Sequence, residues 1–381
     1  MRVTFKFNLS IHFYEFKQYD IMNTILDMKH TKVTYEMPNC YADFDGKFPF
    51  EGIELLKSLE LTTVNVPLRF GGKGLGGNTG NRQVLEVLKE VGSYDLSLGR
   101  IYEGHINALL LIERFGDGNQ KERYFEEAVN GKIFGVWNSE MPTEPLTFND
   151  LNGVFELSGA KVFCSGASNI DRPIVTAEGE KGTRMVIIDM DELRLNEDYT
   201  YWRPMGMKSS VSCRFDFSGV NFDQKQILGG PYDYVNEPDF TSGAARFAAV
   251  QLGGAEAAIR ATIYHLEKTN RTKAPEQLAR LAKLATLQET GRLWLKHTGD
   301  ELNKRYDAPS HSMFRANLFR TVVREICENI LSICEMSVGL QGMMQPHPLE
   351  RIHRDLSVYL KQPGPDRTLI ACAESFLKYD R

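Results

Sequence analysis

The amino-acid sequence predicts a mixed α+β protein in which two helical regions flank a region of β-structure. Apolar side chains recur at helical spacing between residues 41 and 133, and they alternate with polar ones from 134 to 232. Long amphipathic segments return from 233 to 381. A chain of 381 residues can hold two or three buried cores. We therefore expect a helical domain, a β-barrel or sandwich domain, and a helical bundle.

The first 40 residues form a predicted N-terminal extension. Charged residues such as Lys6, Glu15 and Lys17 interrupt anything that resembles the apolar core of a signal peptide. Met22 is an alternative start to Met1. We base no functional expectation on this segment.

The first helical region contains one conspicuous break. Ile53, Leu56 and Leu59 recur at intervals of three, which predicts a helix over residues 51–60. A glycine-rich stretch follows at residues 71–77. Because no Gly-Lys-Ser/Thr motif follows and no strand precedes it, we expect a loop between helices rather than a phosphate cradle.

The middle region has the alternation of half-buried strands. Cys213, Phe215 and Phe217 alternate with polar neighbours, which predicts a strand with one face in the core. Residues 155–163 predict a hairpin that turns at Gly159, and residues 174–177 and 185–189 predict further strands.

Two apolar stripes mark the C-terminal region. They comprise Leu278, Leu281, Ala282 and Ala285, and Leu318, Val322, Ile326, Ile330 and Ile333. Long amphipathic helices of this kind pack as an antiparallel bundle.

The composition is that of an ordinary soluble globular protein, with 42% hydrophobic and 25% charged residues. A net charge of −5 argues against a nucleic-acid partner, and no apolar run reaches the roughly 18 residues of a membrane span. The six cysteines are scattered without metal-ligand spacing. We therefore expect reduced, mostly buried thiols in a cytoplasmic protein and no metal site.

Five motifs then occur in one order along residues 48–364. They are the turn 67–72, the run 115–131, the strand pair 204–217 with 228–229, the helix start 347–355, and Arg354-Asp355 followed by Gly364. In that order they resemble the acyl-CoA dehydrogenases. The resemblance implies a three-domain fold, an FAD held between the β domain and the bundle (with FMN as the alternative), and an oxidoreductase.

The resemblance leaves the catalytic base unassigned. Pro363 occupies the family's glutamate position, and proline has no side-chain proton acceptor. A second family position, on the first bundle helix, falls on residues 244–246, which hold no carboxylate in either register. Three side chains remain as candidates: His105, Glu140 and Asp366.

The resemblance also implies residues near the flavin ring. Residues 137–141 align with the family's threonine-glutamate-proline segment, which places Trp137 and Ser139 at the ring, although residues 143–145 fit the same letters. The segment 161–166 resembles the family's lysine-x-tryptophan segment, so Phe163 would cover the ring and Ser165 would donate a hydrogen bond to it.

Further positions concern the rest of the cofactor and the substrate. Arg271 and Gln277 correspond to residues at the family's FAD pyrophosphate, and Gly339 and Gly342 to a turn that approaches the cofactor from a neighbouring subunit. Arg246 corresponds to a CoA-contacting arginine. The resemblance thus implies a homodimer or homotetramer, with an electron-transfer partner or a flavin reductase.

Three functions are compatible with these residues. The first is dehydrogenation of an acyl thioester carried by CoA or a carrier protein. The second is monooxygenation with reduced flavin, because monooxygenases of this fold lack the glutamate and some use a histidine where His105 lies. The third is a non-catalytic protein that binds flavin or acyl groups.

Overall fold

The computed structural model describes residues 46–151, 153–361 and 364–379, which all belong to one compact unit. The predictions for residues 1–40, for Met22 as the start, and for Pro363 concern positions outside these ranges.

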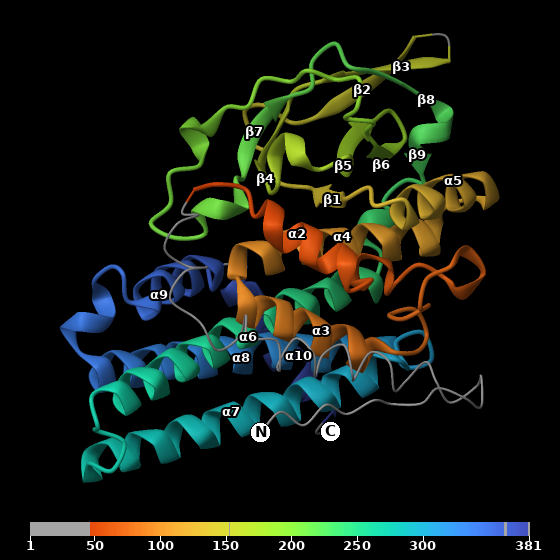
Figure 1. Ribbon diagram of the computed structural model, residues 1–381. Helices are drawn as coiled ribbons and strands as arrows, with labels where there is room; N and C mark the ends of the chain where they lie inside the picture. The colour runs from red at the N-terminus through yellow and green to blue at the C-terminus, as the bar shows by residue number, and fades with distance from the viewer. Residues whose placement is uncertain (1–45, 152, 362–363, 380–381) are drawn as a thin grey trace, which may run out of the picture. The chain divides into compact units, whose positions relative to one another are not determined.

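Four helices precede the strands and five follow them within the described residues (Figure 1). The first group is α2 (Phe50–Ser58), α3 (Asn81–Tyr94), α4 (Leu96–Phe115) and α5 (Gly118–Val129). The second is α6 (Asp239–Lys268), α7 (Pro275–Leu302), α8 (Pro309–Val338), α9 (Pro348–Tyr359) and α10 (Pro365–Tyr379). As expected, residues 71–77 form a loop, which ends before α3.

The strands lie between these groups and form two ladders. They are β1 (Phe134–Trp137), β2 (Thr147–Leu151), β3 (Val154–Ser158), β4 (Ala160–Cys164), β5 (Arg172–Gly179), β6 (Gly182–Ile187), β7 (Cys213–Asp216), β8 (Asn221–Asp223) and β9 (Ile227–Leu228). One sheet has the order β8-β3-β2-β5-β6-β9 with β1 parallel to β5, and β4 pairs with β7 alone. The predicted helix–sheet–helix order and the predicted strands at 174–177, 185–189 and 213–217 are confirmed.

The predicted hairpin over residues 155–163 is wrong. The chain does bend at Gly159, which has φ +107°, and a Cβ there would lie 2.1 Å from the carbonyl oxygen of Pro145. However, β3 pairs with β2 and β8, whereas β4 pairs with β7. Local alternation identified both strands but contained no information about their partners.

Glycines allow the two helical regions to pack closely. α3 packs along α6, where a Cβ on Gly253 would lie 2.0 Å from the carbonyl oxygen of Lys89. Beside this contact the Lys89 ammonium lies 3.2 Å from Glu256, which also accepts from Arg292 at 3.0 Å. The close approach and the buried ion pairs together fix the register of α3 on α6.

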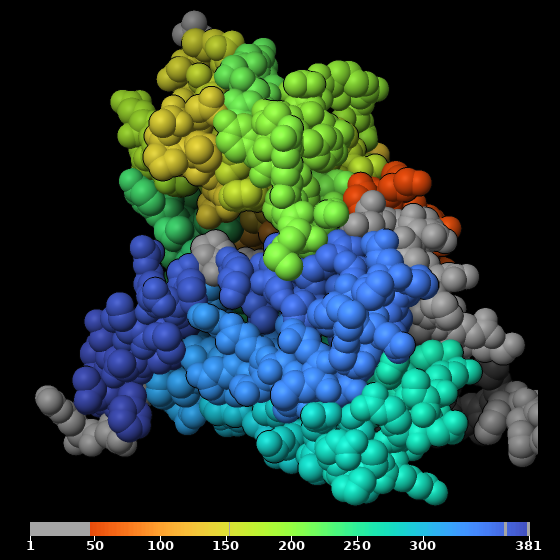
Figure 2. Space-filling view, turned by 90° about the vertical axis from the view of Figure 1, so that its left-hand side faces the viewer, coloured from red at the N-terminus to blue at the C-terminus, as the bar shows by residue number. Residues whose placement is uncertain are grey.

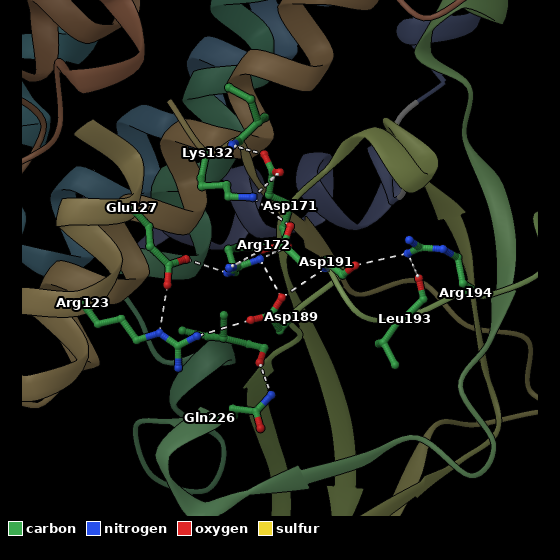
Figure 3. A network of polar contacts seen from close by, with 12 residues as sticks. Arg123, Glu127, Lys132, Asp171, Arg172, Asp189, Asp191, Leu193, Arg194 and Gln226 are labelled. Atoms are coloured by element: carbon green, nitrogen blue, oxygen red, sulfur yellow. Dashed lines mark hydrogen bonds and ion pairs between the residues drawn. The ribbon is translucent and has the colours of Figure 1, made fainter. Parts of the chain in front are cut away.

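A network of charges joins α5 to the first strands (Figure 3). The buried guanidinium of Arg172, at the start of β5, lies 2.6 Å from Glu127, 2.8 Å from Asp189 and 2.9 Å from Asp191. Lys132 adds a contact of 2.7 Å to Asp191. The first helical region is therefore anchored to the edge of the sheet where β1 begins.

The prediction for the C-terminal stripes is half right. Ile326, Ile330 and Ile333 on α8 are buried, as expected. The stripe on α7 faces outward instead, with Leu278 53% exposed, and the buried face of that helix carries Gln277 and Leu284. Helical spacing identified the apolar face of α7, but it did not reveal that this face is exposed.

The contact between α3 and α6 predicts that alanine substitutions at two glycines of α6 change the free energy of unfolding by very different amounts. Gly253→Ala forces a methyl group into the α3 backbone, so we expect a loss of about 3 kcal/mol in the free energy of unfolding, or no folded protein. At Gly243, the nearest atom to an added Cβ is a terminal nitrogen of Arg246, 3.6 Å away. Gly243→Ala should therefore be neutral or stabilising by up to about 1 kcal/mol. Denaturant unfolding measures both, and equal effects would contradict the packing argument.

Candidate functional site

A narrow crevice lies where α4 meets β1 and β4. Its volume is about 10 Å³, and it is lined by Arg100, Ile101, Gly104, Gly135, Val136, Trp137, Ser165 and Ile170. The indole nitrogen of Trp137 donates to the carbonyl oxygen of Ser165 at 3.1 Å and so bridges two of its walls. The predicted residues Trp137 and Ser165 therefore do lie together. The crevice itself has room for about one water molecule, so a three-ring cofactor does not fit inside it.

The predicted residues Ser139 and Phe163 lie instead on an open edge beside the crevice. The carbonyl oxygen of Ser139 accepts from Val162 at 2.9 Å, which places the exposed Ser139 next to β4. The Phe163 ring is 50% exposed, and its backbone has φ +57° at an irregularity in the β4–β7 register. A positive φ is unusual for an aromatic residue and often accompanies a functional site.

Trp202 completes this edge. Its ring lies edge-on to Phe163 with centroids 6.1 Å apart. Its indole nitrogen is buried and has no hydrogen-bond partner among the described residues. A buried unpaired N–H costs free energy unless a ligand accepts from it. We call Ser139, Phe163 and Trp202 the aromatic edge.

A chain of hydroxyl groups runs inward from Ser165. Its Oγ lies 3.0 Å from the Oγ of Ser212, which lies 2.8 Å from the Oγ of Ser210, and Ser210 donates to the carbonyl oxygen of Met207 at 2.9 Å. Each hydroxyl has one proton, and a carbonyl only accepts. The carbonyl oxygen of Met207 also accepts from the amide of Ser210 at 3.1 Å, and the Oγ of Ser212 lies 3.4 Å from the carbonyl oxygen of Ser210, so either hydroxyl of each pair can be the donor. The hydroxyl of Ser165 can therefore donate or accept toward the crevice, and its role as a donor to the flavin stays a prediction.

Glu140 is bound to a buried lysine. Lys161 is 1% exposed, and its ammonium donates to Glu140 at 2.6 Å, to Thr176 at 3.0 Å and to the carbonyl oxygen of Asn138 at 3.1 Å. Burial lowers the pKa of Lys161, and the Glu140 carboxylate opposes that shift. In this conformation Glu140 compensates a buried charge and does not point into the crevice.

His105 has both ring nitrogens engaged by the backbone. Nε2 lies 2.7 Å from the carbonyl oxygen of Thr62 and must donate to it, while Nδ1 accepts from the amide of Phe134 at 3.1 Å. Burial lowers its pKa to about 4. The neutral ring therefore ties α4 to the start of β1, and it offers neither a proton nor a lone pair to a substrate here.

Asp366 lies in the first turn of α10, where it is exposed. It does not line the crevice. Its position suits a favourable interaction with the positive end of the helix dipole.

The residues predicted for the pyrophosphate form a cluster of their own at the start of α7. Gln277 is fully buried, and with its amide oriented by its neighbours it accepts from Arg271 at 2.9 Å and from Arg280 at 3.0 Å. Gly339 has φ +78° and ends α8, and Gly342 is packed against Val338. Neither glycine lines the crevice.

Arg246 belongs to a group of charges between α4 and α6. Its Nε donates to Asn107, which donates to Glu103, and Glu103 also pairs with Arg100. Burial lowers the pKa of Arg246 to about 10. The aromatic hydroxyl of Tyr359 is buried without a partner among the described residues, and this burial raises its pKa, with Glu103 adding to the shift and Arg100 opposing it.

Trp202 and Arg100 are site residues that sequence reasoning missed. Among the described residues that line the crevice, Arg100 is the only charged one, and its side chain is 25% exposed. The available signal was its place on α4, where Arg100, Glu103 and Asn107 follow at helical spacing among apolar neighbours.

Two absences and the state of the cysteines can be given for the described residues. Within them, no group of His, Cys, Asp or Glu is arranged to hold a metal ion, and no helix is long and apolar enough to cross a membrane. The five cysteines in this part of the chain are buried free thiols, which confirms that prediction for them.

The order of helices, sheet and helical bundle is that of the acyl-CoA dehydrogenase fold. Residues 25–132 match the model of the acyl-CoA dehydrogenase N-terminal domain, and residues 245–361 match that of the C-terminal domain. The chain therefore belongs to the acyl-CoA dehydrogenase family, whose members are flavin oxidoreductases.

Individual relatives perform different chemistry. The dibenzothiophene monooxygenase of Rhodococcus erythropolis is 28% identical over 196 residues, which cover 48% of this chain and 45% of that protein. The chain thus spans about half the length of the first curated relatives that it matches.

Two solved structures share the fold. TdsC from Paenibacillus sp. A11-2, in complex with FMN and indole, has a TM-score of 0.80 and 19% identity over 95% of this chain and 97% of its own. Butyryl-CoA dehydrogenase from Megasphaera elsdenii has a TM-score of 0.81 and 20% identity over 98% and 100%.

The buried state of His105 predicts a pH effect on stability. Its pKa is about 4 in the folded chain and about 6.5 when exposed, so the unfolded chain binds more protons between these values. His105 should therefore cost stability as the pH falls from 6.5 to 4, by roughly 3 kcal/mol in total.

His105→Gln cannot titrate, and it keeps a donor for Thr62. At pH 7 we expect it to be less stable than the parent chain by about 1–3 kcal/mol, because the Phe134 amide loses its acceptor. That deficit should shrink or reverse by pH 4. Denaturant unfolding of both proteins across this range measures the difference, and a deficit independent of pH would show that His105 titrates normally.

Proposed function

We propose that the chain binds a flavin along the aromatic edge and uses its reduced form with oxygen to oxygenate a small molecule. One observation carries the choice of reaction: among the described residues, the crevice beside the edge is lined by no carboxylate. Removal of an acyl α-proton needs such a base, whereas oxygenation does not.

The aromatic edge fits the ring end of a flavin. Phe163 offers an exposed aromatic surface, Trp202 an indole N–H without a partner, and Ser139 an exposed hydroxyl. Ser165, in the lining of the crevice, adds a hydroxyl that can donate or accept. A planar ring with polar groups on its rim would meet all four of these requirements.

Within one chain, few of the described residues are placed to contact the nucleotide end of the flavin. Arg271 donates to Gln277, and it lies in the turn before α7 rather than at the aromatic edge. We therefore propose that the chain binds FMN, which needs no contact to an adenosine end. TdsC, which shares the fold, also binds FMN. An FAD would draw on Arg271, Gly339 and Gly342 of a second copy of the chain.

A bound reduced flavin would supply the two electrons that place one atom of O₂ in the substrate and release the other as water. The chain's own residues would shape that step. The bridge from Trp137 to the Ser165 carbonyl holds two walls of the crevice together. Arg100 would hold a polar or anionic group of the substrate, because its guanidinium is the charged group that borders the crevice.

Dehydrogenation of an acyl thioester is the second candidate. The matches to both family domains and the shared fold with butyryl-CoA dehydrogenase favour it. Against it, Glu103 is clamped between Arg100 and Asn107, Glu140 is held by Lys161, and Asp366 is on the surface. Arg246 would then contact the CoA.

The same proposal includes a homodimer and a partner that reduces the flavin. The exposed apolar stripe on α7, with Leu278 53% and Leu293 60% exposed, is a face that a second copy would cover. The reduced state of the buried thiols suits the cytoplasm.

Two assays separate the candidate reactions. With FMN, NADH, a flavin reductase and indole, oxygenation predicts a product 16 mass units heavier than indole that contains ¹⁸O from ¹⁸O₂. In the absence of oxygen, butyryl-CoA should leave the spectrum of the bound flavin unchanged. Bleaching by butyryl-CoA would instead establish dehydrogenation, and failure to bind either FMN or FAD would refute the flavin site altogether.

The aromatic edge predicts which substitution weakens flavin binding. Phe163→Ala removes the exposed ring and should raise the Kd of FMN by about ten-fold. Phe376→Ala is the matched control, because that ring is 55% exposed on α10. Quenching of flavin fluorescence measures both constants. Equal affinities would show that the ring lies elsewhere.

A further inference from the structure

Two buried cysteines lie opposite each other in the ladder of β4 and β7 (Figure 1). Cys164, the last residue of β4, is the register partner of Cys213, the first residue of β7. Both are free thiols, and both residues are 0% exposed. Directly opposed residues of an antiparallel pair have Cα atoms about 4.5 or 5.5 Å apart. Both separations lie within the range of roughly 4.4–6.8 Å that a disulfide spans.

The side chains of such a pair point to the same face of the ladder. The residues next along the two strands, Ser165 and Ser212, have their Oγ atoms 3.0 Å apart. The γ atoms of opposed residues therefore already come into contact one position beyond the cysteines. Burial raises the pKa of the Cys164 thiol well above its usual range, and the neighbouring Cys213 adds to that shift. The two sulfur atoms thus lie close enough to influence each other.

The ladder is irregular at this point. Its register shifts between Lys161 and Cys164, where Phe163 has φ +57°. The amide of Cys213 donates to the carbonyl oxygen of Val211 at 3.1 Å, a residue that itself has φ +38°. A positive φ at a β-branched residue is a true outlier. A covalent link between the cysteines would hold the strands together where their regular pairing is disturbed.

The other described cysteines lack such an opposite partner. Cys327 and Cys334 lie on α8, two turns and so about 10 Å apart along the helix axis, too far for a bridge. Burial raises the pKa of Cys334 to about 12, as it does for Cys213. Burial and acidity therefore do not separate these two thiols, whereas the pairing across the ladder does.

We propose that Cys164 and Cys213 form a reversible disulfide when the folded chain meets hydrogen peroxide. The thiolate of one cysteine attacks a peroxide oxygen, the O–O bond breaks, and hydroxide leaves a sulfenic acid behind. The second sulfur then attacks the first and displaces the hydroxyl group, which leaves as water. In sum, two thiols lose two electrons and two protons, and one hydrogen peroxide becomes two water molecules.

Burial makes this reaction slow. It raises the pKa of Cys213 to about 12, and the carboxylates of Glu197 and Asp198 add to that shift. Lys161 opposes the corresponding shift at Cys164 without cancelling it. Only a small fraction of either thiol is therefore ionised at neutral pH, and the thiolate is the form that attacks peroxide. The bridge should form under sustained exposure to the oxidant rather than in a brief pulse.

The bridge would restrain the strand that carries part of the aromatic edge. Phe163 and Ser165 flank Cys164 along the chain, so a link to β7 would limit how far they can move. Disulfides in reducing compartments are usually transient and redox-sensing. Hydrogen peroxide is also what reduced flavin and oxygen yield in the absence of a substrate. The proposal nevertheless does not rest on the function proposed above, because added peroxide tests it in the flavin-free chain.

The test is to treat the full flavin-free chain with hydrogen peroxide at pH 8, block the remaining thiols with N-ethylmaleimide, and digest it without reductant. We expect one cross-linked species that contains Cys164 and Cys213, with a mass two units below the sum of the reduced peptides. Dithiothreitol should remove it. The midpoint of thermal unfolding should rise by about 5 °C in the bridged chain, because the bridge closes a loop of roughly 50 residues.

Three variants test the assignment. Cys164→Ser and Cys213→Ser should each abolish the cross-link and the rise in midpoint. Cys334→Ser is the matched control, because it removes an equally buried thiol without an opposite cysteine, and it should keep both effects.

The digest of the parent chain decides the matter even if a variant fails to fold. A bridge to Cys40 or Cys372 instead, or stable oxygen adducts on both cysteines without a bridge, would contradict the proposal. A bridge that forms only in the presence of urea would contradict it as well, because the two cysteines would then meet only in the unfolded chain.

Discussion

The guanidinium of Arg351 holds the three parts of this molecule together. It lies 2.8 Å from Asp95 and 3.2 Å from Asp355, and all three residues are buried. Asp95 caps α4 by accepting from the amide of Leu98 at 2.7 Å, and Asp355 accepts from the amide of Met207 at 2.6 Å. Helix α9 is thereby joined both to α4 and to the loop before β7. Figure 2 shows this loop reaching down from the strand region onto the C-terminal helices.

The cluster of Arg351, Asp95 and Asp355 also costs free energy, because its charges are buried. Burial raises the pKa of Asp355 to about 6 in spite of Arg351. The folded chain therefore retains a proton that the unfolded chain releases, and the contribution of Asp355 to stability falls as the pH rises from about 4 to 6. His105 has the opposite slope in nearly the same range. The contributions of Asp355 and His105 to the free energy of unfolding therefore change in opposite directions between about pH 4 and pH 6.

Sequence reasoning recovered the fold because its evidence was local and ordered. The period of apolar residues identified the helices and strands, and motifs such as 347–355 indicated the order in which these elements occur along the chain. Trp137 and Ser165, which were both predicted at the flavin, do lie in one crevice. The partners of β3 and β4, the outward face of α7 and the role of Arg100 depend instead on contacts between distant segments. His105 illustrates the limit, because a helix position alone does not reveal that Thr62 and Phe134 occupy both its nitrogens.

The cluster of Arg351, Asp95 and Asp355 is also connected to the candidate site by hydrogen bonds. The amide of Met207 is held by Asp355, and its carbonyl oxygen accepts from Ser210, from which hydroxyls lead through Ser212 to Ser165. A Cβ on the preceding residue, Gly206, would lie 2.1 Å from the carbonyl oxygen of Arg354, so the loop can approach α9 this closely only with glycine there. The hydroxyl chain that ends at Ser165 is therefore anchored through Met207 to a C-terminal helix, although Asp355 lies 148 residues further along the sequence than Met207.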